Sequence, residues 1–283
     1  MDGLQPLIDF VTKHPRLLVI TGAGCSTAAG IPDYRDENGA WKQREPMRYQ
    51  SFTGSAQARQ RYWARSMLGW RTMAHAQPTA AHHALVQLER AGRIVQLVTQ
   101  NVDGLHQAAG SQAVVDLHGR LDTVCCLGCG TRSPRRDLQE KLMARNPGWL
   151  ALDARSLADG DADLDGLDFA AFDVPACPHC GGLFKPDVVF FGESVPRNRV
   201  AAVREALAQA DAVLVAGSSL MVYSGYRFVE EAVAAGKPVV AVNRGRTRAD
   251  PVLALKVEHE VGMALEGLAR EVTAFDVAPT DLG

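Results

Sequence analysis

The chain has 283 residues, of which 47% are hydrophobic and 22% charged, with 30 basic against 32 acidic residues and a net charge of −2. This is the composition of a globular protein with room for one large domain and a smaller one. The near-neutral charge excludes a general attraction to nucleic acid or to anionic membranes, so an acidic ligand must be held by local groups. No segment approaches the roughly 20 apolar residues that cross a bilayer.

The start of the chain, residues 1–10, shows no basic segment followed by an apolar stretch and no Arg/Ser-rich leader. We therefore expect a cytoplasmic protein. In a reducing compartment its six cysteines are not expected to form disulfides. Four of them fall in two C-x-x-C pairs, a pattern that favours a metal site.

Short apolar runs alternate with longer helical patterns along the chain. We expect helices at 4–13, 55–75, 80–91, 197–210 and 224–236. We expect strands at 16–21, 94–99, 187–191, 212–216 and 238–243. Continuous apolar runs of this length suit strands buried on both faces, as in a parallel sheet. The alternation predicts an α/β fold with a Rossmann-like, doubly wound parallel sheet.

This pattern is interrupted between residues 120 and 185, which hold five of the six cysteines and an acidic segment from Asp159 to Asp173. We expect 120–185 to be an inserted small zinc-binding module. Residues 1–119 and 186–283 then form the larger domain.

Four loops follow predicted strands, beginning at Gly22, Gln100, Gly217 and Asn243. In doubly wound sheets ligands bind beyond the carboxyl ends of the strands. These loops are therefore expected to line one binding site.

The first of these loops reads Gly22-Ala-Gly-Cys-Ser-Thr-Ala-Ala-Gly30. Glycines let the backbone approach a pyrophosphate, and a following helix N-terminus offers free N–H groups to anionic oxygens. However, Thr27 stands where the dehydrogenase fingerprint has its third glycine, and no strand-end acid follows about 20 residues later for the adenosine ribose. The pattern disfavours a hydride-transferring dehydrogenase and leaves a tight turn without ligand open.

The longer run 22–35, which ends in Ile31-Pro-Asp-Tyr-Arg35, closely resembles the G-A-G-x-S-x-x-x-G-I-P-D-[FY]-R signature of sirtuins. The resemblance continues in order through 100–103, 118–119, the paired cysteines, 185–193, 217–220 and 242–243, and covers residues 10–265. The long spacer between the cysteine pairs and the string 59–65 resemble the class II branch of the family.

The resemblance implies an NAD-dependent protein-lysine deacylase, which cleaves nicotinamide from NAD and transfers the acyl group of a modified lysine to ADP-ribose. NAD is then a co-substrate, and the partner is an acylated-lysine protein or peptide. Two alternatives stay open: a protein mono-ADP-ribosyltransferase, which shares the first half-reaction, and a non-catalytic NAD-binding or zinc-ribbon module. The presence of Asn101, Asp103 and His118 argues against a pure binding module.

The resemblance assigns NAD binding to residues of the four loops and their surroundings. They are Gly22, Ala23, Gly24, Ser26, Tyr34, Arg35, Gln100, Asn101, Val102, Asp103, Gly217, Ser218, Ser219, Asn243, Arg244, Gly245 and Val261. Backbone amides with the guanidinium of Arg35 suit a pyrophosphate. Tyr34 is implied to shield the cleaved ribose from water. Val261 is a loose match, because family members often carry Cys-Gly where this chain has Val261-Gly262.

The implied catalytic residues are His118, Asn101 and Asp103. Histidine has the unperturbed pKa that suits base catalysis near neutral pH, and the resemblance makes His118 the base that activates a ribose hydroxyl. Asn101 and Asp103 are implied to pair with the carboxamide of nicotinamide. The same residues are also typical of a turn that caps a helix starting near residue 103.

Two knuckles, Cys126-Leu-Gly-Cys129 and Cys177-Pro-His-Cys180, are each followed by a glycine. Two such turns complete a tetrahedral Zn²⁺ site, and four thiolates leave no open position, so the single predicted ion is structural. Cys125 is expected to be a neighbour of the site, and Cys25 a small packing residue.

Two segments resemble those that sandwich an extended substrate peptide in the family by strand addition. They supply Val189, Phe190, Phe191, Gly192 and Glu193, together with Leu220 and Val222. Tyr62 and Arg65 lie three apart and share one face of a predicted helix. They resemble the Tyr-x-x-Arg pair with which the desuccinylase branch grips an acidic acyl tail. A solvated helix face with an aromatic packed inward explains the pair equally well.

Overall fold

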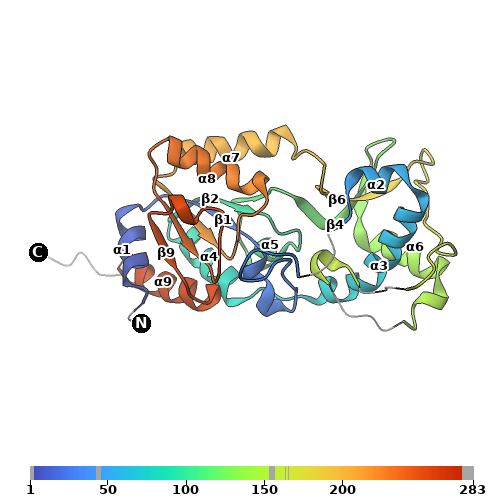
Figure 1. The fold of residues 1–283 in the computed structure, drawn as a ribbon, viewed down its shortest axis with the longest axis horizontal. Helices are drawn as coiled ribbons and strands as arrows, with labels where there is room; N and C mark the ends of the chain where they lie inside the picture. Colours follow the sequence, from blue (N-terminus) through green and yellow to red (C-terminus); the bar gives the residue numbers. More distant parts are fainter. Residues whose placement is uncertain (1–2, 43–45, 153–156, 163, 165, 276–283) are drawn as a thin grey trace, which may run out of the picture.

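The computed structural model describes residues 3–42, 46–152, 157–162, 164 and 166–275, and it shows two lobes side by side along the long axis of the molecule (Figure 1). Asp163 and Asp165 of the acidic segment lie outside the described residues. Among the helices that are described, none combines the length and the apolar character that a membrane span requires.

The larger lobe is built on a parallel sheet in the order β3-β2-β1-β7-β8-β9. Its strands are β1 (Leu17–Thr21), β2 (Ile94–Thr99), β3 (Val114–Asp116), β7 (Ala212–Ala216), β8 (Val239–Val242) and β9 (Leu255–Val257). The central strands β1 and β7 are buried at every position, because helices cover both faces of the sheet. The predicted α/β fold with a parallel sheet is confirmed.

Alternate residues of β1 face opposite helix layers. Leu17 and Val19 pack with α1 (Gln5–Lys13), α4 (Ala80–Arg90) and α9 (Val261–Phe275). Leu18 and Ile20 pack with α7 (Arg197–Gln209) and α8 (Tyr223–Ala234) on the other face. Figure 1 shows α7 and α8 on the opposite side of the sheet from α1 and α9. The period of two along the strand therefore separates the two cores.

The smaller lobe holds an antiparallel sheet in the order β5-β4-β6, formed by β5 (Arg132–Pro134), β4 (Gly119–Cys126) and β6 (Phe184–Val188). Three helices surround it: α2 (Tyr49–Gly54), α3 (Ala56–His75) and α6 (Arg135–Arg145). Phe52 of α2 and Trp63 of α3 share a core with Leu138 and Phe172. Helices that precede residue 119 thus complete the core around the segment 120–185.

The expected parallel strand at 187–191 is wrong. The strand β6 ends at Val188 and pairs antiparallel with β4, with Val188 opposite Gly119. The apolar residues that follow leave the sheet, and Phe190 packs instead against Phe52 and Tyr62. The run is apolar because it packs on aromatic side chains of the smaller lobe, and not because it lies inside the parallel sheet.

Other elements were not predicted from the sequence. Most of them are short, but α9 has 15 residues with apolar side chains at helical spacing and was missed. The unpredicted elements are β3, β9, α2, α6, α9 and the 3₁₀ turns η1 (Ala23–Cys25), η2 (Thr27–Ala29), η3 (Pro147–Trp149), η4 (Ala158–Gly160) and η5 (Asp250–Val252). The helix expected to start near residue 103 is present as α5 (Leu105–Ala109). The turns η1 and η2 also replace the α-helix expected directly after the glycine loop.

Candidate active site

A cavity of about 610 Å³ opens where the strand ends of the larger lobe face the smaller lobe. The loops after β1, β2, β7 and β8 line it, starting at Gly22, Gln100, Gly217 and Asn243. The segment that follows β6 forms a further wall. The predicted convergence of four strand-end loops on one site is confirmed, and the volume suits a small-molecule ligand.

All but one of the residues that the sequence assigned to NAD line this cavity. The exception is Gly245, which has a φ of +77° and lies against the backbone of Glu37, 2.6 Å from where its Cβ would stand. Of the residues assigned to the peptide, Val189, Phe190, Phe191, Gly192, Glu193 and Val222 line the cavity. Leu220 is buried behind the wall, with an unusual φ of +54°.

The glycines of the first loop permit two loops to touch. A Cβ on Gly22 would stand 2.7 Å from the Cβ of Ser218, and one on Gly24 would stand 2.8 Å from the Cα of Gly217. The N–H of Gly24 donates to the carbonyl of Gly217 over 2.8 Å. The loops after β1 and β7 therefore form one rigid floor, from which backbone groups can approach a ligand closely.

Asn101, Asp103 and Ser26 form a hydrogen-bonded cluster on the cavity wall. The hydroxyl of Ser26 donates to Oδ2 of Asp103 over 2.7 Å, and the Nδ2 of Asn101 donates to the carbonyl of Gly22 over 3.0 Å. The other carboxylate oxygen of Asp103 accepts the N–H of Leu105 at the start of α5 over 2.9 Å. Asp103 thus caps the helix and faces the cavity at the same time.

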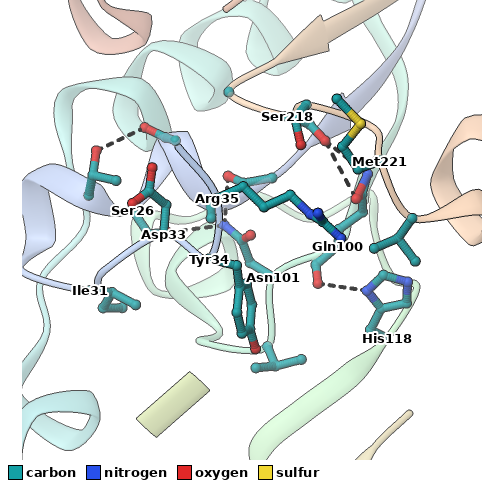
Figure 2. Close-up of a pocket in the computed structure, with 18 of the residues that line it drawn as sticks. Ser26, Ile31, Asp33, Tyr34, Arg35, Gln100, Asn101, His118, Ser218 and Met221 are labelled. Atoms are coloured by element: carbon teal, nitrogen blue, oxygen red, sulfur yellow. Dashed lines mark hydrogen bonds between the residues drawn. The ribbon is translucent and has the colours of Figure 1, made fainter. Parts of the chain in front are cut away.

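His118 lies between the two lobes, directly before β4. Its Nδ1 donates to the carbonyl oxygen of Gln100 over 2.9 Å (Figure 2), and its Nε2 is 2.7 Å from the hydroxyl of Ser224. Burial lowers the pKa of His118 to about 4; the hydrogen bond to Gln100 opposes this shift, and the cationic side chains of Arg199 and Arg227 add to it. The imidazole is therefore neutral at pH 7 and offers a lone pair on Nε2.

The loop after η2 places a cation against an aromatic ring. The guanidinium of Arg35 lies 3.8 Å from the ring centroid of Trp41, and its Nη1 donates to the carbonyl of Gly39 over 2.7 Å. Tyr34 meets the same indole edge to face at 6.0 Å. Arg35 and Tyr34 both line the cavity (Figure 2), so the loop presents a fixed positive charge beside an aromatic wall.

A buried ion pair holds the wall after β6. Nζ of Lys185, which is only 3% exposed, lies 3.0 Å from Oε2 of Glu193. The same carboxylate oxygen accepts the N–H of Phe190 over 2.9 Å. The N–H of Tyr49 donates to the carbonyl of Phe191 over 2.9 Å, which ties the wall to α2. The backbone at 189–192 is thus held in place beside the cavity.

Tyr62 and Arg65 share a face of α3, as expected, but they do not line the cavity. Tyr62 packs edge to face against Phe52 and Phe190, and burial raises the pKa of its hydroxyl, so the hydroxyl stays protonated. Nε of Arg65 donates to Oδ1 of Asp161 over 2.8 Å. The geometry favours the packing interpretation of this pair.

The four paired cysteines come together in the smaller lobe. Their Sγ atoms all lie within 4.8 Å of one another, with 3.5 Å between Cys126 and Cys180 and 3.8 Å between Cys129 and Cys177. A tetrahedron with Zn–S bonds of about 2.3 Å has sulfur–sulfur edges of about 3.8 Å, so the donor set fits Zn²⁺. Cys125 lies outside this group.

Cys25 is buried in the floor of the cavity, and its thiol donates to the carbonyl of Ala216 over 3.4 Å. Burial raises the pKa of Cys25 to about 12. The thiolate is therefore not formed at neutral pH, which agrees with a packing residue and not with a nucleophile.

Several lining residues were not predicted from the sequence. They are Thr27, Ile31, Pro32, Asp33, Asp36, Glu37, Trp41, Lys42, Met73, Val188, Val195, Met221, Tyr223, Ser224, Arg227, Arg246, His259 and Glu260. Those up to Asp33 fall inside the glycine-loop signature, which could have revealed them. Val188 lies in the run 185–193, and Met221, Tyr223 and Ser224 lie in the segment 220–225 that was expected to contact the peptide. The others come from segments without a motif of their own.

The chain matches the family model described as "Sir2 family" over residues 22–224. The chain belongs to the Sir2 family. Sir2-family relatives include the NAD-dependent protein deacetylase 2 of Bradyrhizobium diazoefficiens, 58% identical over 92% of this chain and 96% of that protein. The NAD-dependent protein deacetylase of Bordetella bronchiseptica is 60% identical over 91% of this chain and 94% of that protein.

Solved Sir2 structures share the fold of the whole chain. One, described as "Structural Basis for the Mechanism and Regulation of Sir2 Enzymes", has a TM-score of 0.76 and 31% identity over 97% of this chain and 99% of that one. A structure of Sir2 with a p53 peptide and NAD+ has a TM-score of 0.72 and 28% identity, with the same shares covered. The Sir2 architecture therefore extends through both lobes.

Proposed function

We propose that this chain is an NAD-dependent protein-lysine deacylase. The observation that carries the proposal is the position of His118, whose neutral imidazole faces a cavity bounded by strand-end loops on one side and the segment 188–193 on the other. A base at this point can reach a sugar held by the loops and an acyl-lysine held by the segment. The relatives named above as NAD-dependent protein deacetylases support the same activity.

The residues of the cavity divide the work of this reaction. Backbone amides of 22–24 and the guanidinium of Arg35 hold the pyrophosphate, and Asn101 and Asp103 hold the carboxamide of nicotinamide. His118 takes a proton from a ribose hydroxyl, while Tyr34 keeps water from the cleaved sugar. NAD supplies the ADP-ribose that accepts the acyl group as nicotinamide departs.

The peptide is expected to lie between the backbone at 189–192 and the segment around Val222, where it pairs as an added strand. Main-chain pairing of this kind tolerates many sequences, so the recognised partner is an acylated lysine in an extended protein segment. The four cysteines 126, 129, 177 and 180 would hold a structural Zn²⁺ away from the cavity.

We further propose that the catalytic domain comprises 1–119 and 186–283 and the zinc module 120–185, with α2 and α3 contributing to the core of the module. The spacer of 47 residues between the cysteine pairs supports assignment to the class II branch. A cytoplasmic location stays a prediction.

Mass spectrometry after mixing the protein with NAD and a panel of acetyl-, succinyl- and glutaryl-lysine peptides tests the proposal. The wild-type protein should form acyl-ADP-ribose in step with peptide deacylation. His118→Ala should lower this rate by at least about 100-fold, because general base catalysis is lost. His83→Ala changes an exposed histidine of α4 and should leave the rate unchanged.

Two results would contradict the proposal. Label transferred from NAD to protein without deacylation would indicate a mono-ADP-ribosyltransferase. Binding of NAD without turnover on any peptide would indicate a non-catalytic binding module.

A further inference from the structure

Ser224 lies at the second position of α8, and its side chain lines the cavity beside His118. Its Oγ is 2.7 Å from Nε2 of His118, while Nδ1 of the same ring is 2.9 Å from the carbonyl oxygen of Gln100. A carbonyl oxygen can only accept a hydrogen bond, so Nδ1 carries the ring proton. Nε2 is then the acceptor, and the hydroxyl of Ser224 donates to it.

The two hydrogen bonds come from neighbouring elements that are fixed to each other. A Cβ on Gly225 would stand 2.4 Å from Nε2 of Gln100, so the side chain of Gln100 packs directly against α8. Gln100 in turn reaches Ser218 on the loop after β7, with 3.2 Å between Nε2 and Oγ. The imidazole of His118 is therefore held at both nitrogens by two segments that contact each other.

Proton uptake at Nε2 reverses the polarity of the contact with Ser224. The hydroxyl donates to the neutral ring, but it has lone pairs and can rotate to accept the N–H of the imidazolium. A hydrogen bond from a charged donor is roughly twice as strong as a neutral one. The net effect of the hydroxyl is thus to favour the protonated ring. The positive charges of Arg199 in α7 and Arg227 in α8 have the opposite effect, because they disfavour a second cation nearby.

We infer that Ser224 is a positioning residue for deacylation, which aims Nε2 of His118 into the cavity and stabilises the imidazolium formed during the reaction. The inference rests on the proposed function. The hydroxyl of Ser224 first rotates so that its proton points away from Nε2. The proton of the sugar hydroxyl then moves to the freed lone pair of Nε2, and Ser224 keeps its own proton and accepts the new N–H. The sequence places Ser224 inside the segment 220–225 that was expected to contact the peptide, and gives it no role toward His118.

A matched pair of variants, Ser224→Thr and Ser224→Val, tests the inference. Their side chains have nearly the same size and shape, but only threonine keeps the hydroxyl. With NAD and an acetyl-lysine peptide, Ser224→Val should lower kcat for acyl-ADP-ribose formation by about 10- to 100-fold, the usual effect of losing one hydrogen bond to a charged group. Ser224→Thr should keep most of the wild-type kcat.

The exchange of labelled nicotinamide into NAD in the presence of peptide reports the first half-reaction, which precedes the proton transfer to His118. Both variants should keep the wild-type exchange rate and the wild-type KM for NAD. A substitution that merely damaged the structure would change both quantities. Equal kcat losses in the two variants would overturn the inference in favour of a steric effect. A Ser224→Val protein with wild-type kcat, or one that loses exchange together with kcat, would also overturn it.

The wild-type reaction separates this inference from the proposed function. Wild-type protein that forms no acyl-ADP-ribose would overturn both. If the wild-type protein forms acyl-ADP-ribose, but Ser224→Val and Ser224→Thr have the same kcat, only the role of Ser224 is overturned.

Discussion

Arg65 lies where α3 meets the turn η4, and its ion pair with Asp161 joins the two. The backbone oxygen of Asp161 also accepts the N–H of Leu157 over 2.8 Å, so the pair braces a short segment that packs on α3. Because Arg65 does not border the cavity, we expect Arg65→Met to change kcat/KM on acetyl-lysine and succinyl-lysine peptides by the same factor. Steady-state kinetics on the two peptides measures this ratio.

Arg61, an exposed arginine of the same helix, provides the control. Arg61→Met should leave kcat/KM unchanged on both peptides. If Arg65→Met, but not Arg61→Met, lowered kcat/KM much more on the succinyl-lysine peptide than on the acetyl-lysine peptide, Arg65 would be an acyl-binding residue.

The residues that the sequence assigned to the ligand site are those that stand together in a short continuous motif. The loop 22–35 and the segment 100–103 supply glycines, an amide and a carboxylate that a nucleotide requires. Gly22, Gly24, Asn101 and Asp103 all line the cavity. Trp41 and Ser224 could not be placed in this way. Each reaches the cavity only through tertiary packing, Trp41 against Arg35 and Ser224 against His118.

Among the elements, β4 and β6 connect the cysteine cluster to the cavity. At one end of this ladder Cys126 pairs with Phe184, beside the knuckles, and at the other Gly119 pairs with Val188. The N–H of Val189 donates to the carbonyl of His118 over 2.7 Å just beyond that end. A metal that fixes one end of the ladder therefore also fixes His118 and the backbone that follows Val188.

We expect Cys129→Ser to reduce bound zinc from one ion per chain to nearly none and to abolish deacylation, since structural zinc sites contribute directly to folding. Elemental analysis of the purified protein measures the zinc, and circular dichroism reports the loss of structure. Cys125→Ser, in β4 next to Cys126 but outside the cluster, should keep both zinc and activity. A Cys129→Ser protein that stays folded and active without zinc would contradict this role of the metal.

At the scale of the whole molecule, the sequence predicted the parallel sheet because its strands are continuous apolar runs with loops at their carboxyl ends. It did not predict how the smaller lobe is assembled. The antiparallel pairing of β4 with β6 depends on contacts between residues near 119 and residues near 188, and the core draws in α2 and α3 from before the cysteines. Such long-range pairings leave no period in a single sequence.

Buried histidines link the stability of the larger lobe to pH. His82 of α4 and His106 of α5 lie with their ring centroids 4.5 Å apart, and both side chains are almost fully buried. Nδ1 of His82 accepts the N–H of Thr79 over 3.1 Å, and the hydroxyl of Thr79 donates to the carbonyl of Cys25 in the cavity floor. The histidine pair therefore supports the floor of the cavity from behind.

Burial lowers the pKa of His82 to about 4 and that of His106 well below its ordinary value. The unfolded chain titrates near pH 6.5, so between pH 6.5 and 4 it binds more protons than the folded protein, and the free energy of unfolding falls as the pH falls. For His82 alone the free energy of unfolding falls by about 2 kcal/mol between pH 7.5 and pH 5.

Denaturant unfolding of the wild-type protein, His82→Gln and His83→Gln at both pH values measures this fall in the free energy of unfolding. His83→Gln, at an exposed neighbouring position, should keep the full wild-type pH dependence, whereas His82→Gln should reduce it by about 2 kcal/mol. An unchanged pH dependence in His82→Gln would mean that His82 is not held neutral by its burial.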